Sequence, residues 1–319
     1  FSDWSSDVCS SDLSFFFSND TKMSYYIAGG KGWIGSQLAE MLRKQGKKVT
    51  IGEVRIENRD ALEAEIRASG AAFVLNCAGK TGTPNVDWCE DHKPEVLRSN
   101  VCGALNVCDA ALACGAHVTY YGTGCIYQYD ATHQIHDGHT FTEEDEPNFM
   151  GSFYSFSKVH AEQLMKTYPN VLILRIRMPI SDDLHPRSFV TKITKYSKVI
   201  DIPNSMTVLH EMLPISLDMT ERRLTGVYNF VNPGAISHNE VLTLYRDIVD
   251  PTFTWSNFDK NEQLAMCIKA PRSNNELSAA KLLALYPDVP DVFTAVRNAM
   301  IRIRAAKDAA ADADAAKKQ

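Results

Sequence analysis

Strand and helix signals alternate along the first half of the chain, and this alternation restricts its fold more than any other feature. Short runs rich in β-branched and aromatic residues are separated by longer segments with helical spacing, which is the pattern of a parallel sheet with crossover helices. The expected strands are Ser24–Ala28, Lys48–Ile51, Ala71–Asn76, His117–Tyr121 and Val171–Arg177, and the expected helices are Trp33–Gln45, Pro94–Cys114 and Ser152–Tyr168. The sequence therefore predicts an α/β fold: a Rossmann-like doubly wound parallel sheet with helices on both faces.

A glycine-rich turn, GGKGWIG, joins the first expected strand to the first helix. Gly29 permits a tight turn, Gly32 lets the backbone approach a pyrophosphate, and Gly35 lets the helix pack closely on the strand. Free N–H groups and the dipole at the start of the helix favour phosphates there. A glycine triplet in this context indicates a bound dinucleotide, and we place Trp33 and Ile34 in the same cofactor site.

The end of the second strand bears on which dinucleotide is bound. An acidic residue there favours a free ribose 2′-hydroxyl, and an arginine favours a 2′-phosphate. The segment Gly52-Glu-Val-Arg55 offers both, or simply two solvated charges. We favour NADPH through Arg55 and leave NADH open. The turn after the third strand contains Asn76, Ala78 and Gly79, and either approaches the cofactor or only ends the strand.

These signals suggest a division of the chain. We expect residues 23–177 to form an NAD(P)-binding Rossmann domain, and residues 178–304 to form mainly a smaller C-terminal substrate-binding lobe with some strands returning to the sheet. Residues 1–22 lack the pattern of a signal peptide and are expected to be a non-native or disordered leader, with the native start at Met23. Residues 305–319 form a low-complexity tail of Ala, Asp and Lys.

Tyr154 and Lys158 are spaced to share one face of the helix expected at Ser152–Tyr168. An ammonium beside a phenol favours the phenolate, so this pairing predicts a lowered tyrosine pKa and a group that exchanges a proton with a carbonyl or alcohol. Thr123 follows the fourth strand, at the edge of the sheet where ligands bind, and its hydroxyl could contact the same oxygen. We also assign Lys158 to the cofactor site.

Together these motifs resemble the extended short-chain dehydrogenase/reductase superfamily. More narrowly, the chain resembles the plant-type bifunctional nucleotide-rhamnose synthases, which are 3,5-epimerase/4-keto reductases. The resemblance is carried in order by GKGWIG, RIENRDALEAEI, NCAGKTGTPNVDWCE, YGTGCIYQYD, EEDEPNFMGSFYS, RMPIS, VTKITKYSKVIDIPNSMTVL, SHNEVLTLYRD and APRSNNEL. It covers roughly residues 26–285. The stretches PNVDWCE, IPNSMTVL and APRSNNEL are much more restrictive than the general superfamily pattern.

The resemblance implies conversion of UDP-4-keto-6-deoxy-D-glucose to UDP-L-rhamnose, by 3,5-epimerisation and NADPH-dependent reduction of the 4-ketone. It implies that Cys125 and Lys192 form the acid/base pair of epimerisation, a neighbouring ammonium stabilising the thiolate. Taken without it, the two residues read as a buried thiol and a solvated lysine. In the reduction, Tyr154 would protonate the alkoxide and Thr123 would polarise the ketone.

Asn204 and Arg272 lie in the expected substrate lobe, within IPNSM and APRSNN. The planar donor fork of an arginine suits a diphosphate, so we assign both residues to the substrate, with the alternative that they hold lobe loops together. UDP and dTDP are not separated by the sequence.

Composition limits the other functions of the chain. A net charge of −6 without a basic stripe argues against nucleic-acid binding, and no apolar run approaches the roughly 20 residues that span a membrane. Eight scattered cysteines predict reduced thiols in the cytoplasm, and no metal is expected. A homodimer is left open. Two alternatives remain for the function: a monofunctional dTDP/UDP-4-keto-rhamnose reductase, and a catalytically silent dinucleotide-binding regulatory subunit.

Overall fold

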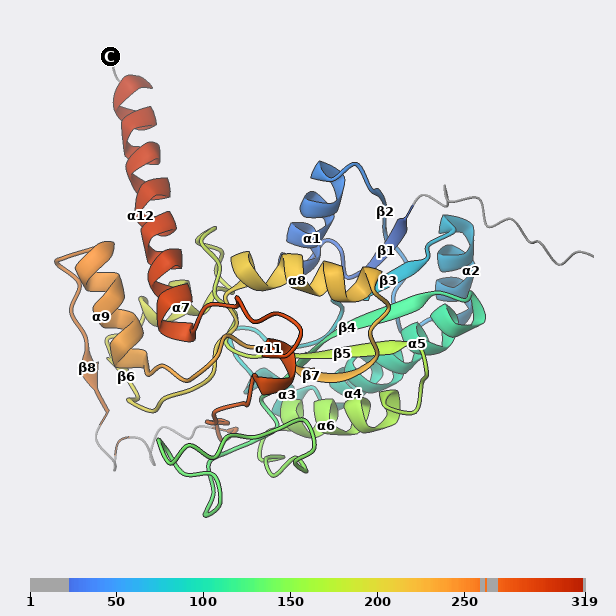
Figure 1. Cartoon of the computed structure of the whole chain (residues 1–319), viewed down its shortest axis with the longest axis horizontal. Helices are drawn as coiled ribbons and strands as arrows, with labels where there is room; N and C mark the ends of the chain where they lie inside the picture. Colours follow the sequence, from blue (N-terminus) through green and yellow to red (C-terminus); the bar gives the residue numbers. More distant parts are fainter. Residues whose placement is uncertain (1–22, 259–261, 263–268, 318–319) are drawn as a thin grey trace, which may run out of the picture.

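The computed structural model describes residues 23–258, 262 and 269–317, and the expected leader lies outside these residues. Six parallel strands form the central sheet in the order β2-β1-β3-β4-β5-β7 (Figure 1). The strands are β1 (Ser24–Ala28), β2 (Lys48–Ile51), β3 (Phe73–Asn76), β4 (His117–Thr123), β5 (Val171–Ile176) and β7 (Gly226–Asn229). The doubly wound parallel sheet is thus confirmed, and β7 brings a segment from the second half of the chain back to it.

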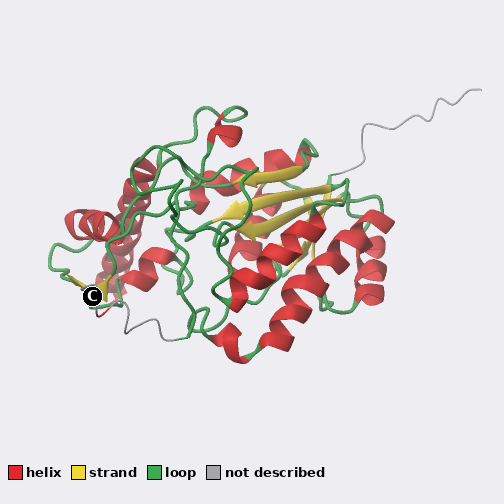
Figure 2. Ribbon diagram, turned by 90° about the horizontal axis from the view of Figure 1, so that it is seen from below, coloured by secondary structure: helices red, strands yellow, loops and turns green. Residues whose placement is uncertain are grey.

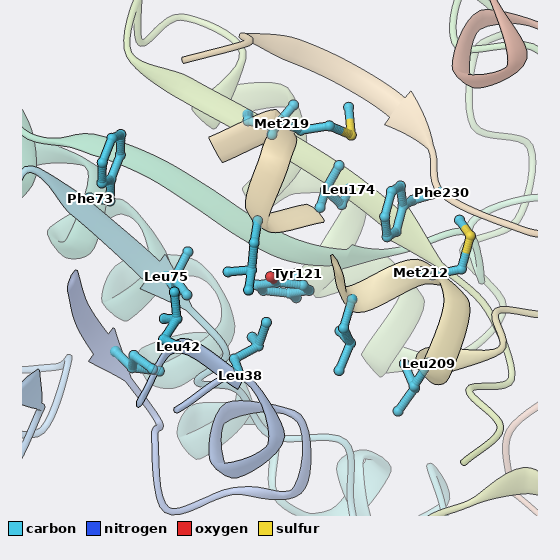
Figure 3. Close-up of a cluster of buried hydrophobic side chains, with 14 of the residues drawn as sticks. Leu38, Leu42, Phe73, Leu75, Tyr121, Leu174, Leu209, Met212, Met219 and Phe230 are labelled. Carbon is cyan, nitrogen blue, oxygen red and sulfur yellow. The ribbon is translucent and has the colours of Figure 1, made fainter. Parts of the chain in front are cut away.

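Helices cover both faces of this sheet. One face carries α1 (Trp33–Lys44) and α8 (Leu209–Glu221), and the other carries α2 (Arg59–Ser69), α5 (Ala104–Ala113) and α6 (Phe153–Met165). Figure 3 shows the core of the first face, to which Leu38 and Leu42 of α1, Leu209 and Met212 of α8, Leu75 of β3 and Leu174 of β5 all belong. Full burial of such aliphatic side chains contributes about 1.5–3 kcal/mol each.

The helix expected over Pro94–Cys114 is present but interrupted. It consists of α4 (Lys93–Leu97), a π-helical turn (Arg98–Gly103) and α5. A Cβ atom at Gly103 would lie only 2.7 Å from Ile56, so the wider turn lies where two segments pack unusually closely. Helical periodicity does not reveal such a turn, which in other proteins often marks a functional site.

The remaining elements belong mostly to a smaller lobe at one end of the sheet (Figures 1 and 2). They are α3 (Trp88–Asp91), α7 (Phe189–Ile193), β6 (Lys198–Val199), α9 (His238–Ile248), β8 (Ser256–Asn257), α11 (Ala280–Leu283) and α12 (Val292–Lys317). A separate apolar cluster joins α7, α9 and α12. The Ala/Asp/Lys tail continues α12 as helix as far as Lys317. The exact domain boundaries stay a prediction.

A buried ion pair fixes α6 against the sheet. The Arg175 guanidinium on β5 donates from Nη2 to Glu162 Oε1 at 2.6 Å and from Nε to both carboxylate oxygens at 3.1 Å. Its Nη1 also donates to Asn229 on β7 at 3.3 Å. Arg175 is fully buried and Glu162 nearly so, and such an arrangement sets the position of the helix relative to two strands.

Candidate functional site

The glycine turn after β1 is built as the sequence predicts. Gly29 has φ +74°, a conformation that disfavours side chains, and a Cβ atom there would lie 2.8 Å from the backbone nitrogen of Ala78. A Cβ atom at Gly35 would lie 2.5 Å from the Gly29 carbonyl oxygen. Gly32 is the extended N-cap of α1 and has no side chain over the helix start. The turn therefore leaves backbone open to an anionic ligand between the ends of β1 and β3, where the strand order reverses.

The side chains of Trp33 and Ile34, which directly follow this turn, pack against other parts of the protein. Trp33 is buried, its Nε1 donates to Asp183 at 2.8 Å, and its ring stacks on His185 with centroids 5.2 Å apart. Ile34 packs on the core of the same sheet face. Trp33 thus ties the glycine turn to the segment that leads into α7, so the expected cofactor site and the lobe are in direct contact. A role for either residue in binding a cofactor stays a prediction.

The charges after β2 lie on the surface in ion pairs. Arg55 is 73% exposed and pairs with Glu57 at 3.0 Å, while Glu53 pairs with Lys31 of the glycine turn at 2.5 Å. Exposed pairs of this kind are weak, so both side chains can reorient towards a ribose or a phosphate.

The turn after β3 forms one wall of a cavity of about 280 Å³. Loop residues 79–83, Trp88 and Arg187 line it. Asn76 is fully buried and its side chain accepts a hydrogen bond from the Ala78 backbone at 3.1 Å. Asn100, from the π-helical turn, accepts from the Lys80 nitrogen at 2.7 Å and donates to its carbonyl at 2.9 Å. Asn100 therefore fixes this loop, which the sequence pattern did not reveal because the π-helical turn was not foreseen.

Thr123 and Tyr154 come together at the end of β4. Both are buried, and the Thr123 hydroxyl lies close enough to the phenol of Tyr154 to lower the pKa of that phenol. Thr123 Oγ1 also accepts from the Cys125 backbone nitrogen at 3.1 Å. The Ser152 hydroxyl caps α6 by accepting from the Ser155 nitrogen at 3.1 Å, which sets where the first turn carrying Tyr154 begins.

The prediction that the Lys158 ammonium lowers the pKa of Tyr154 is wrong. The Lys158 ammonium donates to the hydroxyl of Tyr120 on β4 and lies 4.5 Å from the centre of its ring. The pKa of Tyr154 is raised, first by burial and then by the negative charge of a Cys125 thiolate, and the nearby Thr123 hydroxyl offsets this only in part. Burial lowers the pKa of Lys158 to about 8, against the opposing charges of Glu162 and Cys125. Tyr154 is therefore held as a protonated phenol, ready to donate.

Cys125 follows Thr123 and lies beside the same tyrosine. It is half-buried and packs with Trp88 and Phe153 against the apolar cluster that contains Tyr154. Lys192 lies on α7, half-buried, and its pKa is lowered by burial and by the positive charge of Arg187. Among the described residues, no hydrogen bond or ion pair joins Lys192 to Cys125. Their neighbours Arg187 and Trp88 nevertheless line the same cavity.

Asn204 and Arg272 are each engaged within the protein. Asn204 is fully buried; its Oδ1 accepts from Arg177 and from the Asn275 nitrogen, and its Nδ2 donates to Asn274 at 2.9 Å. Arg272, 44% exposed, forms a two-bond ion pair with Asp87 at 2.9 and 3.1 Å. These contacts are of the kind that holds lobe loops together, and a role in substrate binding stays a prediction.

No helix in the described part of the chain is both long and apolar enough to cross a membrane. Within the same residues, no group of three or more His, Cys, Asp or Glu side chains is arranged to hold a metal ion.

Residues 25–196 match the family model described as the NAD dependent epimerase/dehydratase family. A bifunctional dTDP-4-dehydrorhamnose 3,5-epimerase/reductase from Arabidopsis thaliana is 51% identical over 86% of this chain and 91% of its own length. The crystal structure of the UDP-rhamnose synthase L780 from Acanthamoeba polyphaga mimivirus is 42% identical, with a TM-score of 0.83 over 88% of this chain and 99% of that one.

A more distant match shows the fold alone. The dTDP-4-dehydrorhamnose reductase from Bacillus anthracis, solved in complex with NADP, is 20% identical, with a TM-score of 0.74 over 90% of this chain and 99% of that one.

The buried Lys158 ammonium predicts a pH-dependent stability difference. An unfolded lysine keeps a pKa near 10.5, whereas that of folded Lys158 is about 8. Between these values the unfolded chain binds more protons, so stability rises with pH across this window. Lys158→Met removes the buried charge, and relative to the unchanged chain it gains up to about 3 kcal/mol at about pH 7 and much less near pH 10.

Urea unfolding at several pH values measures this difference. Lys195→Met serves as the control, because Lys195 lies just after α7 and is exposed. A gain that does not change with pH would mean that Lys158 is not destabilised as an ammonium.

Proposed function

The chain belongs to the NAD dependent epimerase/dehydratase family, and we propose that it converts UDP-4-keto-6-deoxy-D-glucose to UDP-L-rhamnose by 3,5-epimerisation and NADPH-dependent 4-keto reduction. The observation that carries this proposal is that groups suited to two different proton transfers lie together at the end of β4. Thr123 and Tyr154 form a proton-donating pair, and the thiol of Cys125 is close enough to influence the pKa of the same phenol. The similarity to the bifunctional plant enzyme and to the viral UDP-rhamnose synthase supports the same reading.

The epimerisation uses the acidity that the 4-ketone gives to the hydrogens at C3 and C5. A base removes one of these protons, the electron pair delocalises onto the ketone oxygen, and an acid returns a proton on the other face of the ring. We assign these roles to Cys125 and Lys192, which belong to different elements and have neighbours on one cavity. Burial and the charge of Arg187 lower the pKa of Lys192, which makes its ammonium a better proton donor.

The reduction places a negative charge on the same oxygen. Reduced nicotinamide supplies the hydride for C4 when it is bound. Tyr154, kept protonated by burial, donates the proton, and the Thr123 hydroxyl orients the ketone. Because the enolate and the alkoxide carry charge on one atom, a single pair of donors can stabilise both transition states. This shared requirement is a physical reason for both activities to occupy one site.

The residues present fit a dinucleotide. A Cβ atom at Gly29 or Gly35 would collide with neighbouring backbone, so the tight turn that would approach a pyrophosphate needs glycine there. Buried Asn76 has an Nδ2 group without a partner among the described residues. Lys158 would hold the nicotinamide ribose. Arg55 would exchange its ion pair with Glu57 for one with a 2′-phosphate, and for this reason we propose NADPH. Comparing initial reduction rates with the two cofactors tests this choice: faster reduction with NADH would contradict it.

For the nucleotide, we propose UDP and assign Arg272 and Asn204 to its side of the site. Binding through Arg272 requires its two-bond ion pair with Asp87 to open, so that the donor fork can turn to a diphosphate. Competition between UDP-sugar and dTDP-sugar substrates separates the two nucleotides, and a preference for the dTDP form would revise this part of the proposal.

Tyr154→Phe separates the two half-reactions. Removing the phenolic hydroxyl takes away the proton donor of the reduction, so this rate falls by about 10²–10⁴. Exchange of the C3 and C5 hydrogens with solvent deuterium continues at a reduced rate, because Cys125 is intact and Thr123 still donates to the enolate oxygen. Nuclear magnetic resonance of the ketosugar in D₂O, with cofactor oxidation followed in parallel, measures both rates. Loss of exchange together with reduction would contradict separate catalytic groups.

Cys125→Ser and Lys192→Ala have the opposite effect. Each removes one acid/base group, so deuterium exchange falls by about 10²-fold or more, while reduction of a ketosugar that is already epimerised is retained. Lys195→Ala, three residues beyond Lys192 and exposed, is the matched control with normal exchange. Normal exchange in both active-site variants would leave a monofunctional reductase. A folded, cofactor-binding chain without exchange or reduction would favour the regulatory subunit.

A further inference from the structure

Two arginines lie two residues apart at the end of β5, and their surroundings differ sharply. Arg175 and Arg177 are both fully buried. Arg175 is neutralised by the carboxylate of Glu162 at 2.6 Å. Arg177 forms no ion pair with any carboxylate among the residues that the structure describes. A buried guanidinium stays protonated, and burying it without an anion is unfavourable.

The hydrogen bonds of Arg177 go to neutral groups and to one thiol. Its Nη1 donates to Ser273 Oγ at 2.9 Å, to the Gly124 carbonyl at 3.3 Å and to Cys125 Sγ at 3.5 Å. Its Nη2 donates to the Ser273 carbonyl at 3.1 Å and to Asn204 Oδ1. These bonds fix the plane of the guanidinium, so that one N–H is directed at the sulfur.

Among the ionisable groups around this pair, Cys125 is the one that Arg177 contacts directly. The carboxylates of Asp201 and Glu276 act on His238 and Tyr129, and neither forms an ion pair with Arg177. Tyr154 and Lys158 reach the thiol from α6, and Cys89 packs in the same cluster from α3. Tyr129 and His238 act on Arg177 from the lobe side.

Burial keeps the two tyrosines and Cys89 protonated and His238 neutral, raising the pKa of Cys89 to about 11 and lowering that of His238 to about 4. Lys158, with a pKa of about 8, titrates close to neutrality. Arg177 is the charge that does not change with pH.

We infer that Arg177 is a positioning residue whose guanidinium holds Cys125 as a thiolate. Ionisation of the thiol releases its proton to solvent and leaves a negative sulfur beside a fixed positive charge, which compensates both buried groups. The assignment of this thiolate to epimerisation rests on the function proposed above. In that reaction the C3–H or C5–H bond breaks, the proton passes to Sγ, and the electron pair moves to the ketone oxygen.

The sequence gives no sign of this role, because Arg177 is 52 residues from Cys125 and no helical spacing relates them. Arg177 also bonds Asn204, so the asparagine assigned to the substrate has a second effect: it helps to set the orientation of the guanidinium.

The thiolate can be titrated without any substrate. Ultraviolet thiolate absorbance is recorded against pH for the full chain and for Cys125→Ser, and the difference isolates Cys125 from the other cysteines. We expect a thiolate fraction at about pH 7 well above the few per cent of an ordinary thiol. In Arg177→Gln that fraction falls about tenfold or more, and in Arg177→Lys it is largely restored.

Arg246→Gln on the exposed face of α9 is the control, and leaves the titration unchanged. A structural role for Arg177 alone would lower stability without moving the titration, and an unchanged thiolate fraction in folded Arg177→Gln overturns the inference. If Arg177→Gln does not fold, the unchanged chain decides: an ordinary thiolate fraction at about pH 7 also overturns it.

A second readout links the charge to the proposed reaction. Solvent deuterium exchange at C3 and C5 in Arg177→Gln falls about tenfold at about pH 7, and the loss becomes smaller as the pH rises, because the thiol then ionises without help. The two claims fail separately. A thiolate that depends on Arg177, with no exchange in the unchanged chain, refutes the epimerase function only. Normal exchange with an unchanged titration refutes the role of Arg177 only.

Discussion

The buried ion pair between Arg175 and Glu162 is the constraint on which the site depends. It joins β5 to the last turn of α6, and Asn229 extends the same contact to β7. Glu162 lies one turn beyond Lys158 and two turns beyond Tyr154, so fixing it fixes both residues over the end of β4. Removing one partner of such a pair costs about 3–5 kcal/mol, which makes this position of the helix hard to change. The Ser152 cap then determines where the helix starts.

The electrostatics of the site follow from the burial of its cations and from the fact that a carboxylate neutralises only some of them. Arg175 has its carboxylate, Arg177 has only neutral acceptors and a thiol, and Lys158 is desolvated beside Tyr120. These surroundings separate the proton affinities of three neighbouring groups. A phenol that remains protonated, a lysine that titrates near neutrality and a thiol beside a fixed cation together cover proton donation and proton removal at one sugar ring.

The sequence was sufficient to predict the parallel sheet and the polar residues near the carboxyl ends of its strands. Alternating signals located β1 to β5, and the spacing of Tyr154 and Lys158 placed them on one helix face. What it missed are contacts between segments far apart in the chain. Lys158 was expected to act on Tyr154, but its ammonium is directed to Tyr120, 38 residues earlier on β4. The π-helical turn that presents Asn100 interrupts a segment whose composition is compatible with uninterrupted helix.

Arg177 illustrates the same limit. As a residue at a strand end it carries no local signal, and its importance appears only when the fold leaves it, among the described residues, without a carboxylate in an ion pair. Asn204 and Arg272 were recognised as polar groups of the lobe, but their engagement with Arg177 and Asp87 depends on how the lobe loops close against the sheet.

The central claim is that one site both exchanges the protons at C3 and C5 and reduces C4. The most direct measurement gives the unchanged chain UDP-4-keto-6-deoxy-D-glucose and NADPH in D₂O, and determines the product by nuclear magnetic resonance. The account predicts UDP-L-rhamnose with deuterium at C3 and C5. A reduced sugar that carries no deuterium and keeps its original configuration at C3 and C5 would contradict it.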